Sequence, residues 1–430
     1  MSSANKDVKF CLKVVINKQK TKVLFAEADS DFADVLLSFL TLPLGKIVRI
    51  LEKHYGDKAP VFGSLTTLYN GLANLESAHF WTEGCKQMLL NPISSFDECR
   101  KLKLDICDTK PVKYFTCEDW DCRSSRKTNV SLYYDIARCD CGKSLKEEVP
   151  MKNRALFEAD DGDVGVFTKR ISTFIISDDL MIFPNEAGSV VHILSNLGIT
   201  ETGLGELMNV TFGFNEIMDL LKGSLISRTP LTDIILNKGQ IELAEPSKPG
   251  IFLHQIKKET DSTSGKMILK VIVQKSTNKI LFAEAEEDFI SFLFSLLTVP
   301  LGGVERLLEG STCLKNIDNL YRSISNVIDF KYFGSAHAMN RLTEPQLPHG
   351  YVSAGNQILP LVEEKACKIY YYRGNEEFVS LSHDMGGSCV KVISFKFLKE
   401  DGLLYVKHLS VCLTSEFKGH LAPKIEVTLR

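Results

Sequence analysis

The chain has 430 residues, with 51 Lys plus Arg against 54 Asp plus Glu and a formal net charge of −3. This length and a hydrophobic fraction of 44% predict an ordinary globular protein of two or three domains. The slightly acidic balance argues against a dedicated nucleic-acid-binding protein, because affinity for phosphate backbones rests mainly on excess Lys and Arg. The content of Leu, Ile, Val and Phe argues against intrinsic disorder.

The sequence shows no targeting or membrane signal. No apolar stretch follows a basic leader at the start, and the longest uncharged stretch, residues 289–304, is shorter than the roughly 20 residues that span a bilayer. We therefore expect a cytoplasmic protein without membrane association, the nucleus being the alternative. In such a chain the 12 cysteines are expected to be thiols or metal ligands rather than disulfides.

An internal repeat organises the chain. Residues 12–52 and 269–309 align without a gap at an offset of 257, and 22 of the 41 positions are identical. After a five-residue deletion the similarity continues weakly and pairs Phe80-Trp81 with Tyr332-Phe333. We therefore predict a tandem duplication, with a first repeat domain at residues 8–244, a linker at 245–266 and a second, divergent repeat domain at 267–430.

In chain order, each copy is predicted to start with a β-hairpin, formed in the first copy by residues 12–16 and 23–28 around a polar turn. Asp29 or Ser30 can cap the helix that follows, and Asp34 is placed to interact with its N-terminal dipole. One face of this helix carries apolar residues at helical spacing: Phe32, Val35, Leu36, Phe39 and Leu40. The segment Leu42-Pro43-Leu44-Gly45 ends the helix, and residues 47–51 begin another.

Further along, residues 142–165 are polar and acidic and are predicted to form a solvated loop. Residues 173–177 and 180–183 flank a turn and predict a second hairpin, and residues 189–197 and 215–225 are amphipathic. The fold class that follows is α+β: a duplicated unit of a β-hairpin plus helices, with a zinc-ribbon-like cysteine insertion in the first copy.

That insertion, residues 107–142, holds five of the 12 cysteines. Cys117 and Cys122 are separated by four residues, Cys139 and Cys141 by one. Four thiolates in two close pairs favour a tetrahedral, structural zinc, which would also explain how a stretch with few aliphatic residues stays folded. The single-residue gap is tighter than in usual zinc knuckles, so reduced, unligated cysteines remain an alternative. Cys107 is predicted to pack as a small apolar residue.

Standard catalytic motifs for nucleotide binding, metalloproteolysis or serine hydrolysis are missing from the sequence. Glu27 and Glu284 are the best repeated carboxylates, and local pairing or capping is the favoured interpretation over acid–base catalysis. The basic run from Arg123 to Lys127 lies beside Trp120 and could meet nucleic acid, although a solvated loop is the commoner explanation.

Several long blocks resemble one known family. They are residues 12–45, Leu89 to Pro92, the cysteine cluster, residues 171–184 and residues 222–236. Together they are similar to the plant family catalogued as domain of unknown function 674 (DUF674), over roughly residues 8–310. That family likewise carries a VLFAEA-type block twice, so the resemblance implies a plant protein with two copies. It carries no established activity, and no catalytic residue is transferred from it.

The second copy departs from the family pattern, because it lacks a four-cysteine cluster and its tail from about Val392 does not resemble the family. The function we expect is that of a non-enzymatic interaction or scaffold protein with protein partners and a structural zinc in the first repeat. The alternatives are nucleic-acid binding through the cysteine-rich loop and an unrecognised enzyme that uses Glu27 or Glu284.

Overall fold

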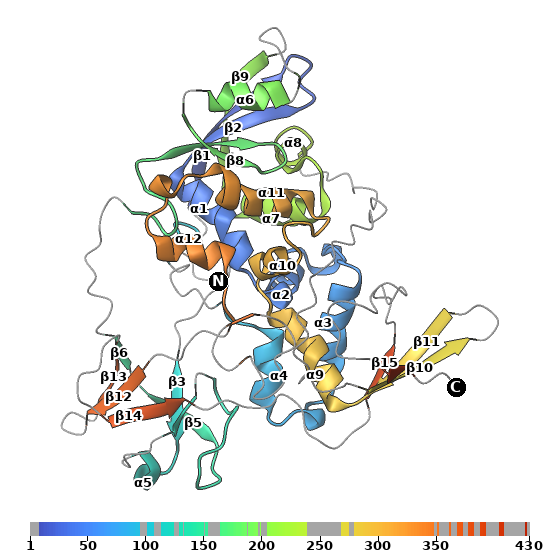
Figure 1. The fold of residues 1–430 in the computed structure, drawn as a ribbon, viewed down its shortest axis with the longest axis vertical. Helices are drawn as coiled ribbons and strands as arrows, with labels where there is room; N and C mark the ends of the chain where they lie inside the picture. Colours follow the sequence, from blue (N-terminus) through green and yellow to red (C-terminus); the bar gives the residue numbers. More distant parts are fainter. Residues whose placement is uncertain are drawn as a thin grey trace.

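The computed structural model describes residues 8–94, 101–106, 113–123, 129–131, 133–149, 151–153, 164–186, 188–196, 198, 204–238, 268–274, 279–347, 351, 361–362, 368–372, 377–381, 388–392, 404–407 and 426–427. Its fold is mixed α+β, with helices through the middle of the molecule and mainly antiparallel sheets around them (Figure 1). The predicted linker at residues 245–266 lies outside the described residues.

The first sheet has the strand order β8-β7-β2-β1-β9 and is antiparallel throughout. Its strands are β1 (Phe10–Asn17), β2 (Val23–Asp29), β7 (Thr173–Ser177), β8 (Ile182–Pro184) and β9 (Leu204–Phe212). Both predicted hairpins are confirmed, because β1 pairs with β2 and β7 with β8. The edge strand β9 pairs along β1 from Phe10 to Asn17 and was not predicted from the sequence.

The helix that follows the first hairpin is also as predicted. Helix α1 (Ser30–Ser38) begins where the side chain of Asp29 accepts a hydrogen bond of 2.9 Å from the amide of Phe32. The predicted apolar face of this segment is fully buried. After the 3₁₀ turn η2 (Phe39–Thr41), helix α2 (Leu44–Tyr55) starts directly behind Pro43. Proline is suited to this place because it has no amide hydrogen to leave unpaired.

The other described helices and helical turns before residue 239 are mostly short. They are η3 (Gly56–Lys58), α3 (Ser64–Asn74), η4 (Ser77–His79), α4 (Glu83–Leu90), α5 (Trp120–Arg123), α6 (Ser189–Asn196), α7 (Phe214–Ile226) and α8 (Pro230–Ile235). The amphipathic segments predicted at 189–197 and 215–225 correspond to α6 and α7.

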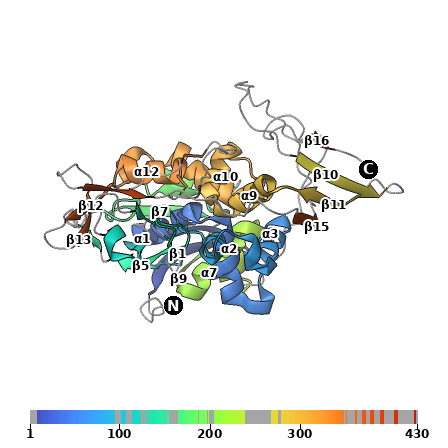
Figure 2. The same cartoon turned by 90° about the horizontal axis from the view of Figure 1, so that it is seen from below.

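From residue 268 onward, the order of elements found at the start of the chain recurs. Strands β10 (Ile268–Gln274) and β11 (Lys279–Ala285) form a hairpin, followed by α9 (Glu287–Ser295), η8 (Leu296–Thr298) and α10 (Leu301–Leu307). The hairpin belongs to a sheet of order β15-β11-β10-β16, with β15 (Leu404–Lys407) and β16 (Glu426–Val427) at its edges, and it projects from the helical middle (Figure 2). The next elements are α11 (Lys315–Arg322), the π-helical turn η9 (Ser323–Val327), η10 (Phe330–Tyr332) and α12 (Ala336–Thr343).

A third sheet combines strands that are far apart in the sequence. Its order is β4-β14-β12-β13-β6. Strands β4 (Asn129–Val130) and β6 (Met151–Asn153) come from the first half of the chain, whereas β12 (Lys368–Tyr372), β13 (Glu377–Leu381) and β14 (Ser388–Val392) come from the second. Because β4 and β6 are the two edges, the three strands from the second half lie between segments of the first.

The two main hydrophobic cores combine the halves in the same way. The first core contains β1, β2 and α1 together with residues of α11, α12 and their flanks, among them Leu320, Phe333 and Leu342. The second core contains β10, β11 and α9 together with residues of α3, α4 and their flanks, among them Leu72, Phe80 and Leu89. Each core therefore takes its hairpin and first helix from one half of the chain and later helices from the other.

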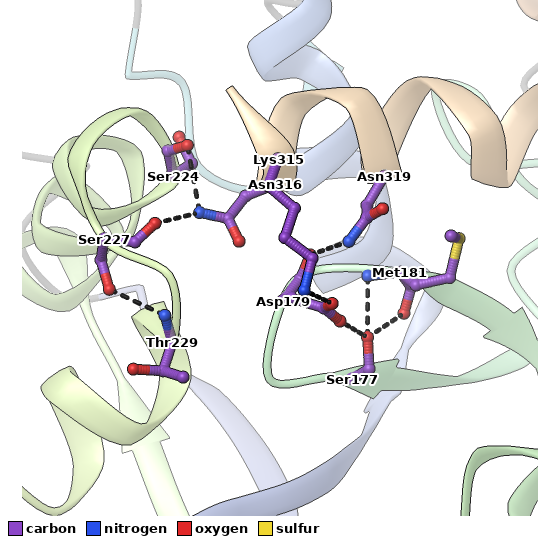
Figure 3. Close-up of polar contacts among 9 residues, drawn as sticks. All are labelled: Ser177, Asp179, Met181, Ser224, Ser227, Thr229, Lys315, Asn316 and Asn319. Carbon is purple, nitrogen blue, oxygen red and sulfur yellow. Dashed lines mark hydrogen bonds and ion pairs between the residues drawn. The ribbon is translucent and has the colours of Figure 1, made fainter. Parts of the chain in front are cut away.

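Polar side chains of α11 attach it to the first half (Figure 3). The amide nitrogen Nδ2 of Asn316 donates to the carbonyl oxygens of Ser227 at 2.7 Å and Ser224 at 3.3 Å. The last carbonyls of a helix have no partner within it, so Asn316 caps the end of α7 from a distant part of the sequence. Next to it, Asn319 Nδ2 donates to the carbonyl of Asp179 at 2.8 Å, and Lys315 pairs with the Asp179 carboxylate at 2.8 Å.

Asp34 has a different environment from the one predicted. Its side chain is 1% exposed and points to the segment before β7 rather than acting at the start of its own helix. The carboxylate accepts hydrogen bonds from the amides of Val166 at 2.7 Å, Phe167 at 3.1 Å and Thr168 at 2.9 Å, and from the Thr168 hydroxyl at 2.8 Å. Burial raises the pKa of Asp34 to about 6, and the four hydrogen bonds oppose that rise.

The polar stretch at residues 142–165, predicted as a solvated loop, contains strand β6 and a second strand before it. Strand β5 (Leu145–Val149) pairs antiparallel with β3 (Tyr114–Cys117). Leu145 and Val149 at its ends are buried, while Glu147 and Glu148 are exposed. A sheet buried on one face needs few apolar residues per strand, so a short, charged segment can form one once a partner strand is available.

Candidate metal centre

The four predicted cysteine ligands lie in a small ribbon built on β3 and β5, at the lower left of Figure 1. Cys117 is the last residue of β3, where the pairing with β5 becomes irregular. Cys122 lies in α5, and Cys139 and Cys141 lie in the turn that leads into β5. Residue Phe115 in the middle of β3 exchanges two hydrogen bonds of 2.8 Å with Ser131, which adds a third segment to the ribbon.

The structure brings the four cysteines together. Their sulfur atoms all lie within 4.8 Å of one another, and the Sγ atoms of Cys117 and Cys141 are 3.5 Å apart. In a tetrahedral zinc site with Zn–S bonds of about 2.3 Å, geometry places the sulfurs about 3.8 Å apart. The residues present therefore fit a four-coordinate metal ion, with Cys117 buried and Cys141 at the surface.

A tight turn explains how two ligands can be separated by one residue. The amide of Gly142 donates to the carbonyl of Cys139 at 2.8 Å, and the amide of Cys139 donates to the carbonyl of Lys143 at 2.8 Å. Gly142 has a φ of +85°, a conformation that residues with a Cβ rarely adopt. The turn folds the chain back within four residues, so both sulfurs face the same point.

The surroundings favour the charged thiolate at one of the four sulfurs and disfavour it at two. Burial raises the pKa of the Cys117 thiol, and hydrogen bonding to Cys141 raises the pKa of the Cys122 thiol to about 12. The amide of Asp119 donates to Cys117 Sγ at 3.4 Å, and a hydrogen bond from the Lys143 backbone lowers the pKa of the Cys141 thiol to about 7. The side chain of Lys143 also pairs with Asp119 at 2.8 Å, which links the turns that carry the two cysteine pairs. Thiolates are the form that binds metal.

The apolar core of the ribbon is small. It consists of one cluster of five buried residues, two of which are candidate ligand cysteines. The five are Phe115, Cys117, Ala137, Cys139 and Leu145. So few apolar side chains bury too little surface to offset the entropy of ordering the segment. A bound metal would supply the missing stability.

Other residues singled out in the sequence have local structural roles or lie apart. Glu27 and Glu284 each form a cross-strand ion pair within their hairpin, with Lys13 at 3.2 Å and Lys270 at 3.8 Å. This local pairing is the favoured prediction for both carboxylates. Cys107 and residues 124–128, which contain Arg126 and Lys127, lie outside the described residues.

The aromatic residues singled out in the sequence differ in how deeply they are buried. Phe80 is buried and Trp81 is half-exposed at 47%, so only the first of this pair is a core residue. In the second half, Phe333 is buried and Tyr332 is half-buried, so Phe333 is the core residue of that pair. On the ribbon, Trp120 and Tyr134 are 56% and 55% exposed.

Comparison with known proteins gives one match. A family described as "Protein of unknown function (DUF674)" matches residues 6–410. The chain belongs to this family. No curated protein and no solved structure matches it. Membership of the DUF674 family agrees with the sequence resemblance and brings no known activity to the cysteine cluster. The match extends to residue 410, so the prediction that the resemblance ends near residue 310 and is lost from Val392 was wrong up to that residue.

None of the helices in the described part of this DUF674 protein has both the length and the apolar character needed to cross a membrane.

Sequence reasoning missed two features of the site. The ion pair between Asp119 and Lys143 joins residues 24 positions apart, and only the folded ribbon brings them together. Strand β5 was missed because its Lys146, Glu147 and Glu148 resemble a loop in composition. The available signal was Leu145 and Val149, two apolar residues in a polar stretch directly after the second cysteine pair.

Proposed function

We propose that this DUF674 protein is a non-enzymatic interaction or scaffold protein whose cysteine ribbon is held by one structural zinc ion. The observation that carries this proposal is the convergence of four cysteine sulfurs within 4.8 Å on a segment with almost no core of its own. Cys117, Cys122, Cys139 and Cys141 would be the ligands.

The donor set favours a structural role over a catalytic one. A catalytic zinc keeps one position open for water or substrate and usually has His or carboxylate ligands. Four thiolates fill the tetrahedron and leave no such position. The zinc would then fix the ribbon and, with it, the surface that carries Trp120 and Tyr134. Exposed aromatic residues of this kind are enriched at protein–protein interfaces, which supports a protein partner.

Metal analysis tests the zinc. Protein purified without chelator should contain one zinc per chain, and the double variant Cys139→Ser, Cys141→Ser should contain none. The backbone amides of Phe115 and Cys139 donate hydrogen bonds within the ribbon. In the variant no metal holds the ribbon folded, so hydrogen exchange at these two amides should accelerate by at least about 100-fold. Cys313→Ser is the matched control, because Cys313 is an exposed thiol outside the cluster. This variant should retain the metal and the slow amide exchange of the ribbon. Wild-type protein without metal would refute the site.

The ribbon surface itself can be tested by binding. Immobilised wild-type protein should retain a protein partner from extract that Trp120→Ala and the double cysteine variant lose, whereas Trp81→Ala should retain it. Binding of single-stranded RNA that weakens steeply with salt would instead favour the nucleic-acid alternative. Turnover of a small molecule that depends on Glu27 or Glu284 would favour an enzyme.

We also propose that the two halves of the chain are copies of one duplicated unit. Local details support this beyond the 22 identical positions. Hairpin β1–β2 has its irregular pairing between Val15 and Ile16, and β10–β11 has it at the equivalent Ile272 and Val273. The later helices correspond at an offset of 253, since Thr82 caps α4 as Ser335 caps α12.

A further inference from the structure

The two halves meet at equivalent residues. Pro43 and Pro300, which are 257 positions apart, form an antiparallel bridge. On one side of it the amide of Leu44 donates to the carbonyl of Val299 at 3.0 Å, and on the other the amide of Leu301 donates to the carbonyl of Leu42 at 2.9 Å. Adding 257 to 44 and to 42 gives 301 and 299, so each hydrogen bond is the counterpart of the other.

The close packing around the bridge repeats in the same reciprocal way. A Cβ added to Gly45 would lie 3.1 Å from both the Cβ and the carbonyl oxygen of Leu297. A Cβ added to Gly302, the equivalent residue, would lie 3.1 Å from the carbonyl oxygen of Leu40 and 3.4 Å from its Cβ. Leu40 and Leu297 are themselves equivalent, so residue i of one half contacts residue j of the other and j contacts i. This reciprocity defines a two-fold interface.

The later helices cross from one half to the other in both directions. Tyr69 donates its hydroxyl to the carbonyl of Leu90 at 3.1 Å, and Tyr321, which corresponds to Tyr69 at an offset of 252, donates to the carbonyl of Thr343 at 3.2 Å. Thr343 corresponds to Leu90 at the offset of 253 that relates α4 to α12. The helix pair that holds the first of these bonds completes the core around β10 and β11. The pair that holds the second completes the core around β1 and β2. The halves have therefore exchanged equivalent helices.

We propose that the face around Pro43 and Pro300 is a homodimer interface enclosed in a single chain, and that the partner it fits is a second copy of the same unit. This proposal rests on the proposed duplication and is independent of zinc. Exchange of identical elements between protomers is a known route to a dimer. Here the linker turns that association into an intramolecular one, and neither half completes its core without the other.

Cleavage of the full chain tests whether the interface, rather than the linker, holds the halves together. A protease recognition sequence inserted after Gly250, in the predicted linker, allows the folded protein to be cut once. The two fragments should still elute as one particle with the mass of the intact 48.1 kDa chain and should unfold in a single transition. Separation of the fragments, whether folded or unfolded, would overturn the proposal.

A glycine series in the same cleavable protein tests the contact face. At Gly302 an added Cβ would lie 2.9 Å from the carbonyl oxygen of Leu342, and backbone atoms must move to admit it. Gly302→Ala should therefore weaken association of the cut halves by roughly tenfold or more, and Gly45→Ala should weaken it in the same direction. Gly71→Ala is the matched control, since Gly71 is an exposed helical glycine whose added Cβ meets nothing within 4 Å. Equal affinity for Gly302→Ala and Gly71→Ala would contradict the interface.

Discussion

Asp34→Asn is expected to lower the free energy of unfolding by about 3 kcal/mol at pH 7.5, because it leaves buried donors without an acceptor. Four hydrogen-bond donors from residues 166–168 converge on the carboxylate, and its side chain is almost fully buried. An asparagine offers one oxygen instead of two and turns its NH₂ group toward amides that also donate. No rearrangement can satisfy all of them.

The backbone leaves no room for such a rearrangement. A Cβ at Gly165 would lie 2.6 Å from Asp34 Oδ2, which shows how closely this segment approaches the carboxylate. Chemical denaturation at pH 7.5 measures the effect. Asp31→Asn provides the control, since Asp31 lies at the surface in an ion pair with Lys103 and should change stability by less than about 0.5 kcal/mol. Equal stability of the two variants would show that the Asp34 contacts are not made in solution.

Glu305→Gln is expected to stabilise the protein in alkaline solution and to have little effect in acid. Glu305 is 0% exposed, and one of its carboxyl oxygens has no hydrogen-bond partner among the described residues. Burial, and then the charge of Asp318, raise the pKa of Glu305 to about 8, against the opposing hydrogen bond from Thr312 and the charge of Arg322. The residue that aligns with Glu305 in the first half is Val48, an apolar side chain that can be buried without the cost of burying a charge.

The sign of the pH dependence follows from that raised pKa. The folded state holds the Glu305 proton more tightly than the unfolded chain, whose glutamate pKa is about 4.5. Its contribution to stability is complete below pH 4.5 and is lost as the pH rises through 8. A glutamine does not ionise, so at pH 8.5 the variant should be more stable than wild type by roughly 4 kcal/mol, and the difference should fall below about 1 kcal/mol at pH 5.

Thermal or denaturant unfolding across pH 5 to 9 measures this difference. Glu309→Gln removes an exposed carboxylate four residues away and should give a curve parallel to that of wild type. If the Glu305→Gln curve also runs parallel to wild type, the carboxyl is already ionised in the folded state at pH 5 and Arg322 neutralises it.

The candidate metal site was predictable as a set of residues, but its geometry was not. Cysteine spacing alone pointed to Cys117, Cys122, Cys139 and Cys141, because two close pairs of thiols in a short polar segment are a pattern typical of zinc sites. The objection to the gap between Cys139 and Cys141 disappears in the structure, where Gly142 closes the turn. Whether the sulfur of one cysteine faces the others depends on strand register and turn conformation. The number of residues between the cysteines does not determine either.

By itself, the sequence determined the local elements and the resemblance between the halves. Three features depend on interactions between residues close in sequence: the hairpins, the cap of α1, and the apolar face that includes Phe32. Hydrophobic periodicity and capping residues predict such features. Only the tertiary structure decided the partners of those elements. The packing of later helices from each half against the hairpin of the other, and the hydrogen bonds from residues 166–168 to Asp34, join segments that are remote in sequence. Helices with similar apolar faces can pack on the hairpin of their own half or on that of the other half, so periodicity cannot tell the two arrangements apart.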